Sequence, residues 1–275
     1  MSAAKSDIKR WFGWLALVVV FSIACVYLSN WQFNRREEAL VAMQQLAQNY
    51  DSPAVPIQQL ATLDTFAKAN EWRKVELVGK YLVDKSVLVR NRPLNGQPGF
   101  LQVVPFELSD GTVIAVERGW VAAGDQYQVP ERVPLPADAT QTVIGRTRAS
   151  EPTLNRTAPP GQLATINIEA LVSSTQIEQK IYNKLYVRMA SESLAGESLS
   201  GVDAPKKLDK PQLGEGNHLS YALQWILFAL MSAAALFWGI KKEREALSGK
   251  KRESKRKLFG QVDAETEDQV LEKQQ

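Results

Sequence analysis

The chain has 275 residues, a formal net charge of +3, one cysteine and one histidine. These counts exclude a disulfide framework and any metal site built from a cluster of Cys and His side chains. Acidic and basic residues nearly balance over residues 30–218, which argues against a nucleic-acid-binding protein. Two long apolar stretches, one near each end, instead indicate a membrane protein.

The first apolar stretch covers residues 11–33. We predict that it forms a first transmembrane helix, preceded by a short cytoplasmic terminus over residues 1–10. The basic residues Lys5, Lys9 and Arg10 would also suit a signal peptide, but no convincing small-x-small cleavage site follows them. The segment SIAC resembles a lipoprotein box only faintly. The stretch is therefore interpreted as an uncleaved anchor.

Residues 34–218 are predicted to form one aqueous domain. Helical periodicity continues through NRREEALVAMQQLAQNY, so the first helix is expected to extend outward until Asp51-Ser52-Pro53 ends it. Runs rich in β-branched residues follow, among them RKVELVGKYLV, GFLQVVPFEL and TVIAVERGWV, and turn residues such as Asp110-Gly111 separate them. A short helix is expected to start near Asn167. Short strands at this spacing predict an antiparallel β-barrel or sandwich with minor helices.

The second apolar stretch, residues 219–240, carries no charge. As a helix it would be about 33 Å long, enough to cross a hydrocarbon core of roughly 30 Å. Basic residues precede the first stretch and follow the second, so the positive-inside rule places both termini in the cytoplasm. The predicted fold class is membrane α plus mainly β, with two transmembrane helices bracketing a periplasmic domain. The basic tail, residues 241–275, is predicted to be disordered and cytoplasmic.

The residues give no support to an enzyme. Neither a phosphate-binding Gly-Lys-Ser/Thr loop nor a dinucleotide-binding glycine fingerprint occurs, and no histidine precedes His218 to activate a nucleophile. Glu107 and Glu117 lie on strands expected to pair through the Asp110-Gly111 turn, and they are interpreted as surface charges rather than as a catalytic pair.

Structural roles are expected in the segment ERGW. The glycine, Gly119, suggests a bulge or a close approach of backbone, and Trp120 is expected to pack in the core or to anchor a partner. Arg118 and Arg92 are also interpreted as structural, with a cationic patch facing the membrane as the alternative.

His218 stands at the start of the second apolar stretch. Asn217 can cap the helix there, and the positive end of the helix dipole disfavours imidazolium, leaving the neutral form that binds metals. Tyr221, Ala222 and Trp225 share its face, where the small Ala222 would let a flat group lie against the helix. One imidazole can supply an axial ligand to haem iron. The alternative is an ordinary polar residue at a membrane interface.

Four stretches, in chain order, resemble a known family. They are LSNWQFNRREEAL with a W-Q-x-x-R pattern, NRPLNGQPGFLQVVPFEL with a G-x-x-G-F block, VIAVERGWVA with an R-G-W block, and NHLSYALQWILFAL. Together they resemble the surfeit locus family of cytochrome c oxidase assembly proteins, and the two-span topology matches. The resemblance implies that His218 ligates haem. GEGNHL departs from the family's usual Asn-Asn before the histidine, which puts a role for paired asparagines in doubt.

The resemblance implies an assembly factor of the cell inner membrane that binds haem a transiently and aids its insertion into the catalytic subunit of haem-copper cytochrome c oxidase. His218 would be the metal ligand, and Tyr221, Trp225, Trp31 and Arg35 would complete the haem site. Arg35 shares a helix face with Trp31 and could pair with haem propionates or with lipid phosphate. The implied partners are the oxidase catalytic subunit, the lipid bilayer and a haem a synthase, without nucleic acid.

Two other functions remain open at this point. The first is a protein–protein scaffold that holds oxidase assembly intermediates without binding haem. The second is a periplasmic sensor that signals through its tail, although the tail contains no recognisable domain.

Overall fold

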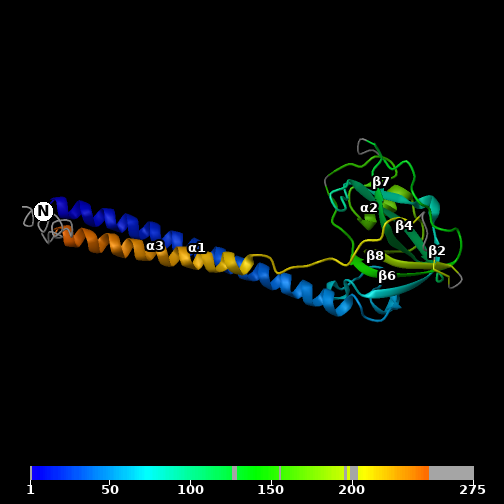
Figure 1. The fold of residues 1–275 in the computed structure, drawn as a ribbon, viewed down its shortest axis with the longest axis horizontal. Coiled ribbons are helices and arrows are strands. Elements are labelled where there is room, and N and C mark those ends of the chain that lie inside the picture. The colour runs from blue at the N-terminus through cyan, green and yellow to red at the C-terminus, as the bar shows by residue number, and fades with distance from the viewer. Residues whose placement is uncertain (1, 126–128, 155, 195–196, 199–203, 248–275) are drawn as a thin grey trace, which may run out of the picture. The chain divides into compact units, whose positions relative to one another are not determined.

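The computed structural model describes residues 2–125, 129–154, 156–194, 197–198 and 204–247. The chain divides into two compact units: a helical unit of residues 1–38 and 216–275, and a sheet unit of residues 39–215. Figure 1 colours their elements in chain order. Of the tail predicted to be disordered, residues 241–247 instead form the last turns of the second long helix, so that part of the prediction was wrong, and residues 248–275 lie outside the described residues.

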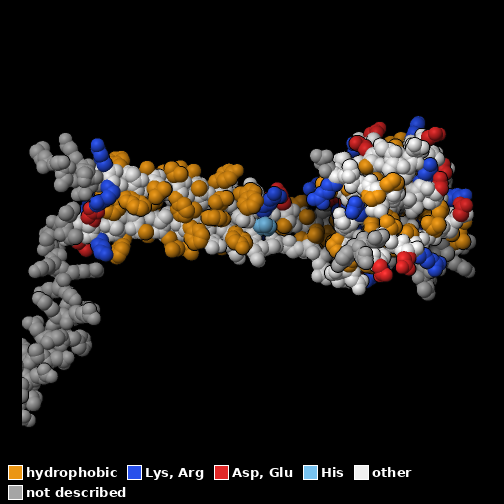
Figure 2. Space-filling model, turned by 90° about the horizontal axis from the view of Figure 1, so that it is seen from above, with side chains coloured by type: hydrophobic (Ala, Val, Ile, Leu, Met, Phe, Trp, Pro, Cys, Tyr) orange, Lys and Arg blue, Asp and Glu red, His pale blue; other side chains and the backbone are white. Residues whose placement is uncertain are grey.

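The helical unit consists of two helices, α1 (Ser2–Asn49), which continues into the sheet unit, and α3 (His218–Leu247). Both are long and apolar enough to cross a membrane. Only 11% and 0% of the residues in their most apolar windows are buried by protein, so neither is the core helix of a soluble domain. Figure 2 shows hydrophobic side chains over much of the visible surface of these helices. The end of α1 at Asn49 confirms that the first helix extends well beyond the predicted span.

The two helices run side by side in opposite directions (Figure 1). Small side chains allow this close approach. Ser29 Oγ donates a hydrogen bond of 3.0 Å to the carbonyl oxygen of Ala222, and Ala222 is completely buried by the contact. Further along, a Cβ at Gly239 would lie 3.1 Å from the ring of Trp11, so the glycine makes room for the indole.

The sheet unit begins with the last turns of α1. The Asn49 amide donates hydrogen bonds of 2.8 Å to the carbonyl oxygens of Ala69 and Glu71. Arg146 Nε donates to the carbonyl oxygen of Tyr50 at 3.0 Å, and its guanidinium carbon lies 3.6 Å from the centre of the Tyr50 ring. Side-chain hydrogen bonds to backbone carbonyls and a stacked cation therefore fix the end of α1 on the sheet.

Nine strands form one sheet within the described residues. They are β1 (Val55–Pro56), β2 (Lys74–Tyr81), β3 (Val87–Val89), β4 (Gly99–Leu108), β5 (Val113–Ala122), β6 (Gln141–Ala149), β7 (Gln162–Leu163), β8 (Ile181–Leu194) and β9 (Glu197–Ser198). The minor helices are α2 (Ile168–Thr175) and three 3-10 turns, Ile57–Gln59, Lys68–Asn70 and Val83–Lys85.

The strand order is β1-β2-β6-β8-β5-β4-β3-β7, with β9 on β8, and β2 also pairs with β4. Five strands, β2, β6, β8, β5 and β4, therefore make a closed circuit of backbone pairing. The sheet is mixed rather than antiparallel, because β5–β8, β1–β2 and β3–β7 are parallel pairs. The prediction of an antiparallel sheet was wrong here because the long connection through β6, β7 and α2 returns β8 beside β5 in the same direction.

Two apolar clusters flank β4 and explain its nearly continuous hydrophobic sequence. Val104 and Phe106 belong to a cluster with side chains of β2, β5, β6 and β8. Leu101 and Val103 belong to another, in which α2 packs on β3, β4 and β5. Trp120 lies in this second cluster and is 7% exposed, which confirms its expected core position.

Local signals in the sequence are confirmed in the sheet unit. The Asn167 side chain accepts the N–H of Ala170 at 2.9 Å and caps α2. Asp110 accepts the amide and hydroxyl of Thr112 at 2.9 and 2.6 Å in the β4–β5 turn. At Gly119 a Cβ would lie 2.6 Å from the Lys206 carbonyl oxygen, and the β4–β5 register shifts at the same place, so the expected bulge and close backbone approach are both present.

The interpretation of Glu117 as a surface charge was wrong, since this residue is completely buried. Arg188 Nε donates to both of its carboxylate oxygens at 3.0 Å. Burial raises the pKa of the Glu117 carboxyl, against the opposing pull of Arg188. Sequence spacing placed Glu117 on a two-stranded hairpin, whereas β8 covers the other edge of β5 and supplies the arginine.

Arg118 also takes a buried partner. It is bonded to Glu192 through Nη2–Oε1 at 2.6 Å and Nε–Oε2 at 3.2 Å. Its Nη1 donates to Gln102 Oε1 and to the Pro134 carbonyl oxygen at 3.0 Å. The Tyr81 hydroxyl donates to Glu192 at 3.3 Å, and burial raises the pKa of Tyr81. Arg118 therefore has the structural role expected from the sequence.

Candidate functional site

The imidazole of His218 lies between its own helix and α1. Its Nδ1 is 2.9 Å from Oε1 of Gln32. A side-chain amide oxygen only accepts hydrogen bonds, so Nδ1 carries the hydrogen and donates it. In the neutral ring, Nε2 is then unprotonated and keeps its lone pair. The bond to Gln32 thus selects the tautomer that coordinates a metal through Nε2.

The register of the two helices brings these residues together. Ser29 is bonded to Ala222, and the same faces continue one turn further to Gln32 on α1 and His218 on α3. The carbonyl oxygen of Asn217 accepts the N–H of Tyr221 at 3.1 Å, which starts α3 immediately before the histidine. A close helix contact and a helix start therefore fix the position of the ring.

Gly216 leaves the Nε2 edge of the ring uncovered on one side. A Cβ at this position would lie 3.3 Å from both Cδ2 and Nε2 of His218. Gly216 also has φ +68, a left-handed conformation that other residues rarely adopt. The ring is half-buried, and Figure 2 shows the histidine of the chain, in pale blue, at the surface of the helical unit.

The expected role of Ala222 was wrong. It was expected to offer a flat surface to a bound group, but α1 covers it completely. The tight contact at Ser29 is the reason, since the small side chain serves helix packing instead. Tyr221 is 51% exposed, and Trp225 is half-buried in an edge-to-face contact with Phe228, with ring centres 5.8 Å apart.

Trp31 and Arg35 form a second local group. The Arg35 guanidinium carbon lies 5.8 Å from the Trp31 ring centre, and its Nη1 is 2.9 Å from Glu38 Oε2. Trp31 is 47% exposed. The structure thus brings Trp31 and Arg35 together in one group. His218 and Gln32 form a separate group. Over the described ranges, no hydrogen bond or ion pair joins Arg35 to His218.

Gln32 is the site residue that sequence reasoning missed. It lies inside the W-Q-x-x-R pattern, between the two residues that were assigned a role. The available signal was its uncharged amide at the end of an apolar stretch, because polar side chains in such helices usually have a specific partner. Its partner lies 186 residues away along the chain, which sequence spacing does not reveal.

The donor set limits the kind of metal that would fit. In the part of the chain that the structure describes, no three His, Cys, Asp or Glu side chains gather to hold an ion. A single imidazole suits a metal that brings its other ligands with it, as iron does in a porphyrin. His218 would therefore hold a metal that arrives within a porphyrin better than a bare metal ion.

Comparisons with known proteins agree with the resemblance. The chain matches the SURF1 family over residues 19–230. An uncharacterised SURF1-like protein of Mycobacterium tuberculosis is 31% identical over 234 residues, 82% of each chain. A SURF1-like protein of Rickettsia felis is 22% identical over 231 residues, 78% of this chain and 91% of the relative. The cytochrome oxidase assembly protein SHY1 of Saccharomyces cerevisiae is 31% identical over 111 residues, 39% of this chain and 28% of that protein. Because the match extends from the first apolar helix to the second, the chain belongs to the SURF1 family.

Proposed function

We propose that this protein is an assembly factor for haem-copper cytochrome c oxidase, and that it carries haem a as a transient cargo on His218. Membership of the SURF1 family and the name of the yeast relative support the assembly role. The observation that carries the haem proposal is the 2.9 Å bond from His218 Nδ1 to Gln32, which leaves Nε2 able to coordinate.

In this proposal each residue of the site has a defined task. Gln32 orients the ring and fixes its tautomer, and Gly216 keeps the Nε2 edge open. The exposed rings of Tyr221 and Trp31 offer apolar surface, and Arg35 offers a cation for a propionate, in competition with Glu38. Haem iron would supply the electron-pair acceptor for Nε2. Trp225, four residues after Tyr221 on the same face of α3, would line the haem groove with it.

A single imidazole suits a carrier because release breaks only one coordinate bond. The half-buried ring is reachable from the surface. We propose that the protein binds and delivers haem a rather than converting it. The recipient is the oxidase catalytic subunit, and a haem a synthase is the proposed donor.

The proposed topology follows from the charges at the helix ends. Basic residues lie before the apolar part of α1 and after that of α3, so both termini would be cytoplasmic in a cell inner membrane. The sheet unit would then be periplasmic. We further propose that the five-strand circuit is a small β-barrel that docks the partner proteins.

The alternative function is a scaffold that holds oxidase intermediates without haem. One observation favours it: Arg35 already pairs with Glu38, so a propionate would have to displace that carboxylate. The two functions predict different spectra for the purified protein.

The deciding experiment is the visible spectrum of protein purified from membranes of cells that make haem a. We expect a haem band in the wild type and in Gln224→Ala, an exposed position on another face of α3, and its loss in His218→Ala. All three proteins should be equally stable. A haem band that survives in His218→Ala would overturn haem ligation by this residue. The absence of any band, with oxidase assembly intact in the variant, would establish the scaffold instead.

A further inference from the structure

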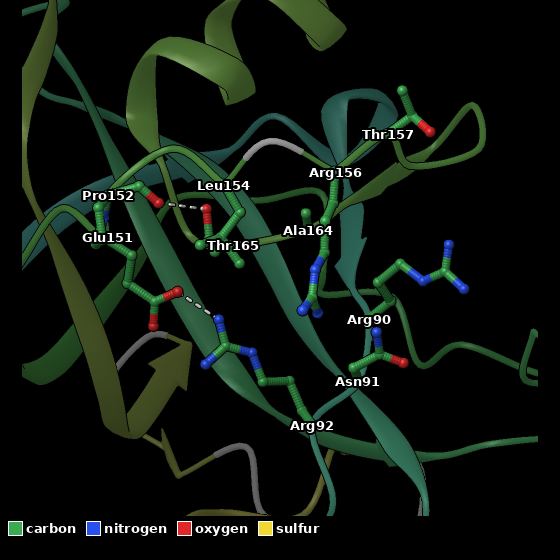
Figure 3. Close-up of a pocket in the computed structure, with 10 residues that line it drawn as sticks. All are labelled: Arg90, Asn91, Arg92, Glu151, Pro152, Leu154, Arg156, Thr157, Ala164 and Thr165. Carbon is green, nitrogen blue, oxygen red and sulfur yellow. Dashed lines mark hydrogen bonds and ion pairs between the residues drawn. The ribbon is translucent and has the colours of Figure 1, made fainter.

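A second polar site lies in the sheet unit, on residues that the haem proposal does not use. It is a cavity of about 780 Å³ between the chain that follows β3 and residues from two described stretches, 151–154 and 156–165. Three arginines, Arg90, Arg92 and Arg156, line it together with one carboxylate, Glu151. Figure 3 shows Arg156 reaching across from one side of the opening, with Arg90 and Arg92 on the other.

One of the three arginines is fixed by protein. Arg92 forms an ion pair with Glu151, drawn as a dashed line in Figure 3. Glu151 also accepts the N–H of Ile166 at 2.9 Å, and the carbonyl oxygen of Arg92 accepts the indole N–H of Trp120 at 2.6 Å. The negative charge in the cavity is therefore already neutralised, and it is held in place by the core.

The other two arginines have no such partner. Across the described ranges, neither Arg90 nor Arg156 makes a side-chain hydrogen bond or ion pair with the protein. Their two positive charges are thus unbalanced within a single cavity. Asn91, between Arg90 and Arg92, has φ +57, a conformation uncommon for residues other than glycine. With Asn91 in this left-handed conformation, the side chains of its two neighbours point in different directions. Arg92 points to Glu151, and Arg90 points away from it (Figure 3).

The walls of the cavity are not only polar. Leu154, Pro152 and Ala164 contribute apolar surface, and the volume falls within the range of sites for small organic ligands, about 300–1,000 Å³. Two free guanidinium groups prefer the paired oxygens of a carboxylate or a phosphate. A bare inorganic anion would leave most of the space unfilled.

We propose that this cavity binds a small organic anion, whose carboxylate or phosphate groups are held by Arg90 and Arg156 while its apolar body rests on Leu154 and Ala164. Arg92 holds the chain after β3 in position through its ion pair with Glu151. The ligand is bound by the other two arginines. The site is separate from His218 in residues and chemistry, so it stands whether or not the chain carries haem.

The test is calorimetric titration of the purified full chain at low salt with two probes. Phthalate presents two carboxylates on an apolar ring, and inorganic pyrophosphate presents phosphate without an apolar body. We expect saturable binding of at least one probe, weakened about tenfold or more in Arg90→Gln and in Arg156→Gln, because each variant removes a charged hydrogen-bond donor. Tighter binding of phthalate would indicate that the natural ligand is an organic carboxylate. Tighter binding of pyrophosphate would indicate that it carries phosphate groups.

The control is Lys180→Gln, which removes an exposed cation beside the β4–β5 turn, at the other end of β4 from the cavity. It should bind both probes as the wild type does, and thermal unfolding should show that all variants are folded. Binding of neither probe by the folded wild type would overturn the proposal. So would an equal loss of binding in Lys180→Gln, because the effect would then come from net charge alone.

Discussion

Two polar pairs, Arg118–Glu192 and Gln32–His218, differ in how many of their hydrogen-bonding atoms remain available to a ligand. In the sheet unit, Arg118 and Glu192 are 3% and 4% exposed, and Gln102, Tyr81 and a backbone carbonyl form further hydrogen bonds with the pair. In the helical unit, Gln32 engages only one nitrogen of the His218 ring, which stays half-buried. The first pair is buried and bonded to several other protein groups, whereas the second retains one unused lone pair on Nε2.

This difference separates a structural role from a binding role. A buried charge whose partner is removed is strongly destabilising, because nothing else compensates it. A half-buried imidazole with one free nitrogen adds little to the free energy of unfolding. A ligand can replace the water at that nitrogen without disturbing the fold. The following variants would break or sharpen the distinction.

The largest effect is expected from Arg118→Ala, which leaves Glu192 buried without its cation. The free energy of unfolding should fall by about 3–5 kcal/mol. Chemical denaturation of the purified protein measures it, with His218→Ala as the comparison, for which a change below about 1 kcal/mol is expected. The double variant Arg118→Met, Glu192→Met should recover part of the loss. Equal stability of Arg118→Ala and His218→Ala would remove the distinction between the two pairs.

The next effect concerns Gln32→Leu, which removes the acceptor of the His218 Nδ1 hydrogen. Loss of such an outer partner typically weakens metal binding by about 10–100-fold. Haem occupancy after purification, measured from the visible spectrum, should drop while stability stays close to wild type. Gln32→Glu keeps an acceptor oxygen at the same reach and should retain more haem than Gln32→Leu. If Gln32→Leu held haem as well as the wild type, the bond would have no part in orienting the ring.

A smaller effect is expected at Gly216, whose left-handed backbone lies beside the imidazole. Gly216→Ala should cost about 1–2 kcal/mol of conformational strain and push on the Nε2 edge of His218. Asparagine tolerates this conformation better than alanine, so Gly216→Asn should retain more haem. This expectation also accounts for the sequence departure before the histidine, since Gly and Asn share the required geometry. Equal haem occupancy in both variants would show that backbone strain is not the deciding factor.

The smallest effect is a pH dependence of the β4–β5 turn. The hydroxyl of Thr112, followed by its amide, lowers the pKa of Asp110. A lowered folded-state pKa means that the contribution to stability is present above the unfolded pKa and is lost as pH falls through the folded one. Asp110→Asn should therefore be less stable than wild type at neutral pH, with the gap closing in acid. Urea denaturation across that range measures it, and a gap that stays constant with pH would contradict the assignment.

Elements set by neighbouring residues could be predicted from the sequence. The helix start at Asn167, the turn at Asp110 and the bounds of β4 each depend on side chains only a few positions apart. Both apolar helices were also predictable, since length and hydropathy suffice. The position of His218 at a helix start belongs to the same group.

Features that depend on distant partners could not be predicted in the same way. The burial of Glu117 requires Arg188 on a parallel neighbour, and strand spacing alone does not indicate which strands pair. Ala222 was expected to face a ligand because its small size fits either a flat group or another helix. Gln32 was missed for the same reason, because only the antiparallel helix contact brings it to His218.

The double pairing of β2 has a consequence for biosynthesis. The circuit through β2, β6, β8, β5 and β4 closes only when β8 enters between β5 and β6, and β8 is the last of the five to be made. Until then, β5 and β6 each present an unpaired edge that can join another chain. A ribosome that stalls before Ile181 would release a chain prone to aggregation, and α3 follows soon after β8. Completion of the sheet and synthesis of the second apolar helix therefore fall within the same short interval.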